Sequence, residues 1–205
     1  SYLNEYGADY GGFVLFCPKS PRNVCLERAK EIIAALNPGI GKVAVCVNIT
    51  ISQANAIADA GFDILQLHGA MFPEVCMNAR LPIWRALTPE DEVGLKLALR
   101  QRKIEALLFD APEPGGGETF DWEAGGGILS QEGEGDLLQG KKLFLAGGLT
   151  PENVAEALDR FHPFGVDVSS GVEWEGLPKG SGKDPEKIKK FIEAVREWDK
   201  KKTQS

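Results

Sequence analysis

Short runs of apolar and β-branched residues recur at fairly even intervals along the chain and predict seven β-strands. The runs cover residues 11–16, 42–48, 63–68, 83–87, 105–110, 142–147 and 165–170. Between most of these runs, apolar residues spaced i, i+3, i+4 and i+7 predict amphipathic helices at 26–36, 52–60, 90–101, 152–161 and 185–198. Strict alternation of strand and helix predicts parallel strands joined by right-handed crossovers.

Two α/β architectures have this alternation, an open doubly wound sheet and a closed (βα)8 TIM barrel. The strands are short and evenly spaced, and no GxGxxG motif follows an early strand, which favours the barrel. A (βα)8 barrel has eight strands, whereas this sequence shows seven and opens with what resembles the end of a helix. We therefore expect one barrel domain over residues 1–205 that lacks its first strand and the start of its first helix.

Local signals indicate where individual elements begin. Thr150 and Asp184 each precede a proline, as expected of N-cap residues before the first helical position. Residues 112–141 are rich in glycine and show little periodicity, so we expect a loop with one short helix. A flexible linker has a similar composition, but a linker here would divide the sheet, and a loop on the active-site face explains the segment better.

Composition and charge narrow the classes of function. Lys and Arg number 23 against 30 Asp and Glu, giving a net charge of −7. No basic segment with interleaved aromatic residues precedes the Lys-rich C-terminal tail, so a nucleic-acid partner is not expected. No apolar stretch reaches the roughly 18 residues of a spanning helix, and the first residues do not resemble a signal peptide. The sequence thus predicts a soluble protein without a membrane partner.

The four cysteines form no CxxC pair, and only two histidines could join them as metal ligands. A zinc site or a disulfide framework is therefore not expected, and a reducing cytoplasm fits this usage. We expect Cys46 to be buried in a strand, and Cys25 and Cys76 to pack within helices.

Candidate functional residues follow the predicted strands, because βα loops carry the active site of such barrels. Gly147 and Gly148 follow one strand, and Ser169, Ser170 and Gly171 follow the next. Adjacent clusters of this kind offer a phosphate close backbone approach, N–H donors and hydroxyls. Ordinary tight-turn glycines are the alternative explanation for either cluster alone.

Five further positions belong to the same predicted edge. Arg22 ends a proline-stiffened loop and could hold a carboxylate, although a solvated surface arginine has the same pattern. Asp110 closes an apolar strand, where partial burial suits a general acid, and a capping role is the alternative. His68 could be a base but is more commonly a hydrogen-bonded spacer. We assign Gln66, His68 and Asp167, with Arg22, to substrate binding.

Seven segments taken together resemble the phosphoribosylanthranilate isomerase family of tryptophan biosynthesis. They are GFVLFCPKSPRNV (12–24), VAVCVNIT (43–50), ILQLHG (64–69), LLFDAPEPGGGETFDW (107–122), LAGGLTPENVAEAL (145–158), HPFGVDVSSGVE (162–173) and GKDPEKIKKFIEAVR (182–196). The fourth and sixth segments are the most specific.

The resemblance implies a (βα)8 barrel that catalyses an Amadori rearrangement of N-(5-phosphoribosyl)anthranilate with no metal or organic cofactor. It further implies that Asp110 is the general acid and that Arg22 holds the anthranilate carboxylate. The five residues of the two clusters would bind phosphate, and Asp167 would lie near the sugar. The expected protein is a monomer or homodimer whose partner is a phosphorylated small molecule.

The sequence departs from the family at its start. Family members begin with a strand carrying K-x-C-G, whose cysteine is the general base, and this sequence starts after that point. Cys17 could be imagined as a substitute, but a packed thiol is its commoner fate. Two hypotheses follow: a catalytic isomerase whose first strand is absent from these residues, or a non-catalytic fragment that keeps the phosphate site. A related sugar-phosphate isomerase is a third reading, because fold does not fix substrate.

Overall fold

A computed structural model describes residues 1–88, 90–110 and 138–204. The chain divides into two compact units. The first contains Ser1–Ala86 and Leu97–Leu107, and the second contains Leu87–Lys96 and Leu108–Ser205. The boundary crosses two strands and one helix. A single domain over residues 1–205 stays a prediction.

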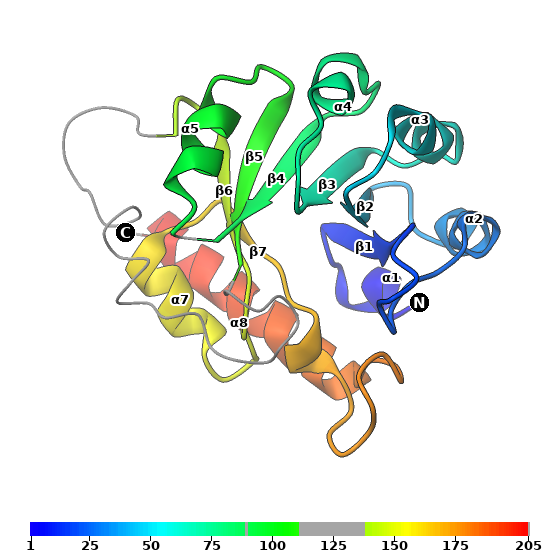
Figure 1. The fold of residues 1–205 in the computed structure, drawn as a ribbon. Helices are drawn as coiled ribbons and strands as arrows, with labels where there is room; N and C mark the ends of the chain where they lie inside the picture. Colours follow the sequence, from blue (N-terminus) through cyan, green and yellow to red (C-terminus); the bar gives the residue numbers. More distant parts are fainter. Residues whose placement is uncertain (89, 111–137, 205) are drawn as a thin grey trace. The chain divides into compact units, whose positions relative to one another are not determined.

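The first unit is built from parallel strands and the helices that connect them (Figure 1). Its elements are α1 (Tyr2–Tyr6), β1 (Tyr10–Val14), α2 (Leu26–Ala34), β2 (Gly41–Val47), α3 (Ile51–Asp59), β3 (Ile64–His68), α4 (Pro73–Asn78), most of β4 (Ile83–Leu87) and most of β5 (Ile104–Phe109). β1 pairs with β2, β2 with β3 and β3 with β4, each in parallel. The amide of Ile83 donates to the Lys103 carbonyl, which places the start of β5 next to β4.

Sequence-local signals and core packing together explain these elements. Thr50 and Gln53 form a reciprocal capping box that starts α3. Every residue of β4 is buried, as expected for a strand covered on both faces. The ring of Phe13 meets that of Phe62 edge to face at 5.4 Å between centroids.

The second unit holds the remaining strands and two packed helices. Its elements are most of α5 (Glu92–Leu99), the last residues of β4 and β5, β6 (Lys142–Leu145), α7 (Val154–Phe161), β7 (Gly165–Val166), a 3₁₀ turn η1 (Ser170–Val172) and α8 (Pro185–Gln204). The indole Nε1 of Trp198 on α8 donates to Asp159 Oδ1 on α7 at 2.6 Å, and the two helices lie side by side (Figure 1).

All seven predicted strands are present, parallel where their pairing is described, and adjacent in chain order. The predicted α/β class is confirmed. The strand predicted at 165–170 is wrong in length, because it ends at Val166 and Ser170–Val172 turns into a 3₁₀ helix. The glycine-rich segment predicted as a loop with a short helix falls largely on residues 111–137, outside the described residues.

Two local predictions at helix starts need correction and one is confirmed. The helix predicted from residue 152 begins at Val154, and the Thr150 hydroxyl accepts from the Glu152 amide instead of capping it. Cys25 is exposed at the N-cap of α2, so it does not pack within a helix. Asp184 does cap α8, since its Oδ1 accepts from the amides of Glu186 and Lys187.

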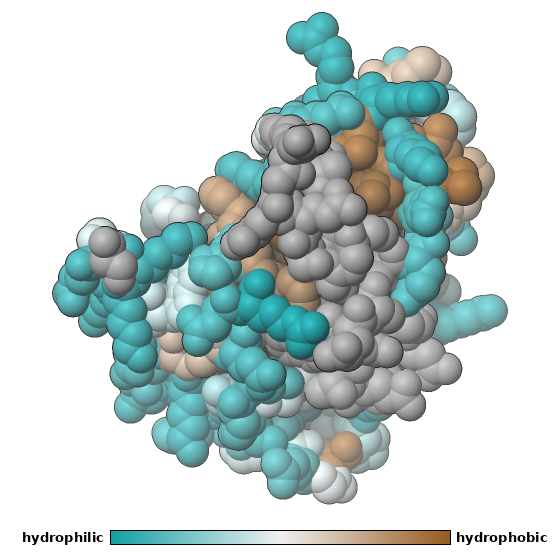
Figure 2. All heavy atoms as spheres, turned by 90° about the vertical axis from the view of Figure 1, so that its left-hand side faces the viewer, coloured by the Kyte–Doolittle hydropathy of each residue, from teal (hydrophilic) through white to brown (hydrophobic). Residues whose placement is uncertain are grey.

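Hydrophilic side chains predominate among the coloured atoms on the face drawn in Figure 2. In the part of the chain that the structure describes, no helix combines the length and the apolar character needed to cross a bilayer.

Candidate functional site

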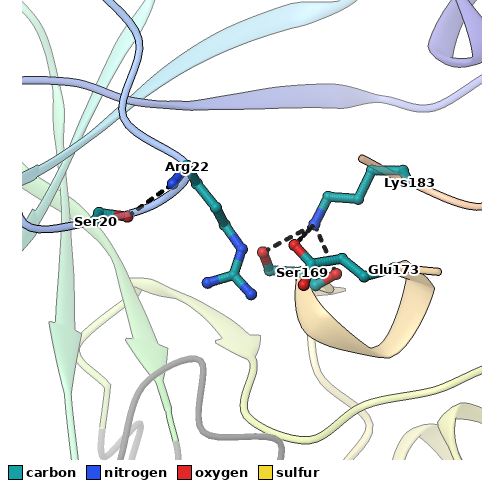
Figure 3. A network of polar contacts seen from close by, with 5 residues as sticks. All are labelled: Ser20, Arg22, Ser169, Glu173 and Lys183. Atoms are coloured by element: carbon teal, nitrogen blue, oxygen red, sulfur yellow. Dashed lines mark hydrogen bonds and ion pairs between the residues drawn. The ribbon is translucent and has the colours of Figure 1, made fainter. Parts of the chain in front are cut away.

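In the first unit, Arg22 lies on a loop that its own hydrogen bonds hold in place. The Arg22 amide donates to the Ser20 hydroxyl at 3.3 Å (Figure 3), and the Ser20 amide donates to the Cys17 carbonyl at 2.8 Å. Asn23 closes the loop, because its Oδ1 accepts from the Cys17 amide at 2.8 Å. These hydrogen bonds hold the backbone at Arg22 in place. The residue is half-buried, unlike a fully solvated surface arginine.

Gln66 and His68 lie two residues apart on β3, so their side chains share one face of the strand and contact one another. His68 Nε2 lies 2.8 Å from Gln66 Oε1, and since an amide oxygen only accepts, this nitrogen carries the proton. Burial, and secondarily the charge of Arg85, lower the pKa of His68 to about 4. His68 is therefore neutral at physiological pH, and its hydrogen-bonded state agrees with the spacer reading of this residue.

Arg85 on β4 is a buried cation at a predicted strand end, and the sequence analysis assigned it no role in the site. It is 7% exposed, and its guanidinium donates to the carbonyls of Leu67 at 2.9 Å and Gly69 at 2.5 Å. These bonds fix the carboxyl end of β3, where Gln66 and His68 lie. A charged residue inside an otherwise apolar strand was the available sequence signal.

The low pKa of His68 predicts a stability that depends on pH. Unfolding returns the imidazole to its ordinary pKa of 6.5, so the unfolded chain binds a proton that the folded chain refuses. We expect the free energy of unfolding to fall by about 3 kcal/mol as pH drops from about 6.5 to about 4. Urea unfolding at several pH values measures this slope.

The substitution His68→Gln should flatten that slope, because no proton is then taken up at this position on unfolding. His162→Asn is the matched control, since His162 is exposed at the end of α7 and asparagine tolerates its left-handed backbone. An unchanged slope in the His68 variant would contradict the assignment.

The cysteines of the first unit differ in their surroundings. Cys46 is fully buried, as predicted, and burial together with the nearby Cys17 raises its pKa to about 12. Cys46 thus stays a thiol at neutral pH and cannot serve as a base. Cys76 is also buried, as predicted, whereas Cys17 is half-buried.

In the second unit, three adjacent strands present polar groups at their carboxyl ends. The Asp110 amide donates to the Leu87 carbonyl at 3.0 Å, and the Ala146 amide donates to the Phe109 carbonyl at 2.8 Å. These bonds place the end of β5 beside the end of β6. Asp167 follows β7, where its amide donates to the Leu145 carbonyl at 2.8 Å. Asp110 is 9% exposed, while Asp167 is exposed.

The turn after β6 requires glycine for its backbone. Gly147 and Gly148 have φ angles of 81° and 65°, in the left-handed region that favours glycine. Asn153 braces this turn, because its amide group donates to the Gly148 carbonyl at 3.0 Å and its Oδ1 accepts from the Thr150 amide at 2.8 Å. The tight-turn explanation of these glycines is therefore correct, and it leaves the phosphate assignment open.

Gly171 has a different requirement, close approach to another backbone segment. A Cβ atom at this position would lie 1.9 Å from the Leu149 carbonyl oxygen. The turn after β6 and η1 are thus in direct contact, and the two clusters identified in the sequence lie together.

Several backbone N–H groups at the contact between the two turns have no hydrogen-bond acceptor among the described residues. Among the described residues, no backbone group accepts from the amides of Gly147, Gly148, Ser169, Ser170 and Gly171. Thr150, Ser170 and Gly171 also border a hollow of about 360 Å³, whose charged lining consists of Glu152, Glu173, Glu175, Lys179 and Lys187. Unpaired amides with adjacent hydroxyls suit the oxygens of an anion.

Lys183 and Glu173 flank the same turn and were not selected from the sequence. Lys183 Nζ donates to the Ser169 carbonyl at 2.7 Å, to the Ser169 hydroxyl at 3.1 Å and to Glu173 Oε1 at 3.1 Å (Figure 3). Lys183 follows a loop ten residues after Glu173. Neither residue lies at a strand end, so the search for strand-end residues could not find them.

Comparisons with known proteins agree in pointing to one family. The family model described as N-(5'phosphoribosyl)anthranilate (PRA) isomerase matches residues 3–194. An N-(5'-phosphoribosyl)anthranilate isomerase from Pelobacter propionicus is 39% identical over 198 residues, which cover 94% of this chain and 88% of the relative. One from Streptococcus mutans is 40% identical over 191 residues, covering 93% and 89%.

Solved structures show the same relationship in three dimensions. The phosphoribosyl anthranilate isomerase of Thermotoga maritima superposes with a TM-score of 0.78 at 36% identity, covering 96% of this chain and 92% of that one. A PRA isomerase solved with reduced 1-(o-carboxyphenylamino)-1-deoxyribulose 5-phosphate gives 0.75 at 34% identity, covering 96% and 91%. The 3-hexulose-6-phosphate synthase of Salmonella typhimurium, 13% identical with a TM-score of 0.66, shares the fold alone.

Proposed function

Since the chain belongs to the N-(5'-phosphoribosyl)anthranilate isomerase family, we propose that it converts N-(5-phosphoribosyl)anthranilate into 1-(2-carboxyphenylamino)-1-deoxyribulose 5-phosphate in tryptophan biosynthesis. The family match extends over residues 3–194, and the chain spans 88–89% of the two relatives named above. The family's fold is the TIM barrel, in agreement with the structural likeness.

The observation that carries the residue assignments is the arrangement at the ends of β5, β6 and β7. Asp110, the 147–148 glycines and Asp167 follow three adjacent strands at the same edge, and the 169–171 turn lies against Leu149. A buried carboxyl group beside amide donors that have no acceptor among the described residues suits an acid that acts on a phosphorylated sugar.

In the proposed reaction, Asp110 donates its proton to the furanose ring oxygen. The C1–O bond breaks as the anthranilate nitrogen lone pair forms a C=N bond to C1. A base accepts the C2 proton, which gives an enolamine, and tautomerisation moves the enol O–H proton to C1 to form the ketose. The proton taken from C2 then restores the acid form of Asp110 through the solvent. C1 is reduced and C2 is oxidised within one molecule, so the balance needs no external redox partner.

The substrate has an anionic group at each end, and the proposal assigns a donor set to each. The guanidinium of Arg22, on its hydrogen-bonded loop, holds the anthranilate carboxylate. The amides of residues 147–148 and 169–171 bind the phosphate. Gln66 and His68 contribute neutral polar groups to substrate binding, since His68 does not carry a charge at neutral pH.

The same proposal includes a cellular compartment, a small-molecule partner and an oligomeric state. All four cysteines are free thiols, which suits a reducing cytoplasm. The partner is a phosphorylated small molecule, and the protein acts as a monomer or homodimer. A Thermotoga maritima relative is described as dimeric.

The direct test measures conversion of N-(5-phosphoribosyl)anthranilate to its ketose isomer by chromatography with the purified chain. We expect turnover when the family's first strand with its general-base cysteine is present, and competitive inhibition by the reduced product analogue. Binding of that analogue without turnover would instead support a non-catalytic phosphate-binding module. Turnover of a different phosphorylated aldose alone would point to another isomerase of the same fold.

A further inference from the structure

The 169–171 turn is held by a lysine that lies on a separate segment of the second unit. The antiparallel bridge between Glu173 and Lys183 aligns the two segments, and the Asp184 amide donates to the Val172 carbonyl at 2.8 Å. From this position the Lys183 side chain reaches back to Ser169 (Figure 3). We propose that Lys183, anchored by Glu173, is a positioning residue that orients the 169–171 turn for phosphate. This inference rests on the proposed phosphate site.

Peptide geometry explains how a contact to one carbonyl orients a donor. In a planar trans peptide, the C=O of one residue and the N–H of the next point in opposite directions. Lys183 Nζ holds the Ser169 carbonyl at 2.7 Å, which fixes the Ser170 N–H on the opposite side of that peptide. The Val172 amide approaches the same carbonyl at 3.4 Å and reinforces this orientation.

The second bond from Lys183 prepares the Ser169 side chain. The hydroxyl oxygen accepts from the ammonium at 3.1 Å, so its own proton remains available to another acceptor. Both effects turn donors toward an anion and keep a carbonyl oxygen, which would repel it, engaged with the lysine.

Glu173 holds the Lys183 ammonium in place and balances the positive charge of that lysine. Its side chain is 10% exposed and accepts from Lys183 at 3.1 Å. Because this carboxylate offsets the ammonium, Lys183 affects a bound anion chiefly through geometry. A purely electrostatic role would need an uncompensated charge.

A comparison of Lys183 with Lys187 distinguishes a positioning role from a general effect of positive charge on phosphate binding. Lys187 borders the same hollow as Ser170 and Gly171, and it pairs with the exposed Glu175 at 2.6 Å. No hydrogen bond from Lys187 to the 169–171 turn exists among the described residues. Lys187→Met therefore removes a nearby positive charge and leaves the brace intact, whereas Lys183→Met removes both.

The experiment measures KM, kcat and the dissociation constant of inorganic phosphate, the last by calorimetry. We expect Lys183→Met to raise KM and the phosphate dissociation constant about tenfold with kcat within about threefold, because one oriented donor is lost. Lys187→Met should change each constant by less than about threefold. Lys183→Arg, which keeps a charged donor for Ser169 and Glu173, should recover part of the phosphate affinity.

Equal effects of the two Met substitutions would overturn the positioning role in favour of charge alone. A fall in kcat with unchanged phosphate affinity would overturn it as well. If Lys183→Met does not fold, Lys183→Gln serves, because its shorter, uncharged side chain loses the ammonium bonds to Ser169; wild-type phosphate affinity and KM in that variant would overturn the positioning role. Phosphate binding needs no turnover, so failure of the isomerase assay alone rejects the proposed activity and leaves this inference standing. Failure of wild type to bind phosphate rejects the site itself and the inference with it.

Discussion

Asp110→Asn is expected to lower kcat by about 10²–10⁴-fold while KM changes little, because positioned acid catalysis contributes a factor of that size. The amide keeps the shape and the acceptor oxygen of the carboxyl group but has no acidic proton for the ring oxygen. Asp110 is 9% exposed at the end of β5, and its backbone is fixed by the bond to Leu87. Steady-state kinetics of the active enzyme with N-(5-phosphoribosyl)anthranilate measures the change.

Asp63→Asn is the matched control for this substitution. Asp63 directly precedes β3, at the amino ends of the strands, and its exposed carboxylate pairs with Lys42 at 2.8 Å. Such pairs contribute about 0–1 kcal/mol, so kcat should stay within about twofold. If Asp110→Asn keeps more than a tenth of wild-type kcat, Asp110 is not the acid.

Gly171→Ala is expected to weaken phosphate binding about 100-fold and to raise KM correspondingly. The added Cβ would lie 1.9 Å from the Leu149 carbonyl oxygen and 2.9 Å from its carbon, and both are backbone atoms that cannot rotate away. The two turns must therefore separate, which misplaces the amide donors of both. Loss of one charge-assisted hydrogen bond costs about 1.5–3 kcal/mol, roughly 10- to 100-fold, and two turns are affected.

The same clash should reduce the free energy of unfolding by about 1–3 kcal/mol, the usual range for overpacking. Phosphate calorimetry and urea unfolding measure the two effects. Gly39→Ala is the control, because a Cβ there has no atom within 4 Å. Wild-type phosphate affinity in the Gly171 variant would show that contact between the turns does not determine anion binding.

The sequence by itself determined the α/β class and the seven strands, because side-chain periodicity reports which face of each element is buried. It also located the α8 cap at Asp184, a signal contained in three consecutive residues. Family membership followed from motifs that extend over nearly the whole chain. These features depend on local chemistry, which the order of residues contains directly.

Element ends were less well determined where tertiary contacts compete with local preference. The strand from residue 165 ends after two residues, and the chain then forms η1 and the bridge between Glu173 and Lys183. Thr150 looked like a helix cap, and its amide does donate to Asn153 Oδ1, but α7 begins only at Val154.

Only the tertiary structure decided how the candidate residues are supported. The pKa of His68 depends on burial and on Arg85, which reaches it from a neighbouring strand. The need for glycine at position 171 arises from Leu149, more than twenty residues earlier in the chain. The brace from Lys183 to Ser169 likewise joins separate segments. Sequence patterns identify residues that follow strands, but close approach, desolvation and hydrogen bonds between distant segments arise only when the chain is folded.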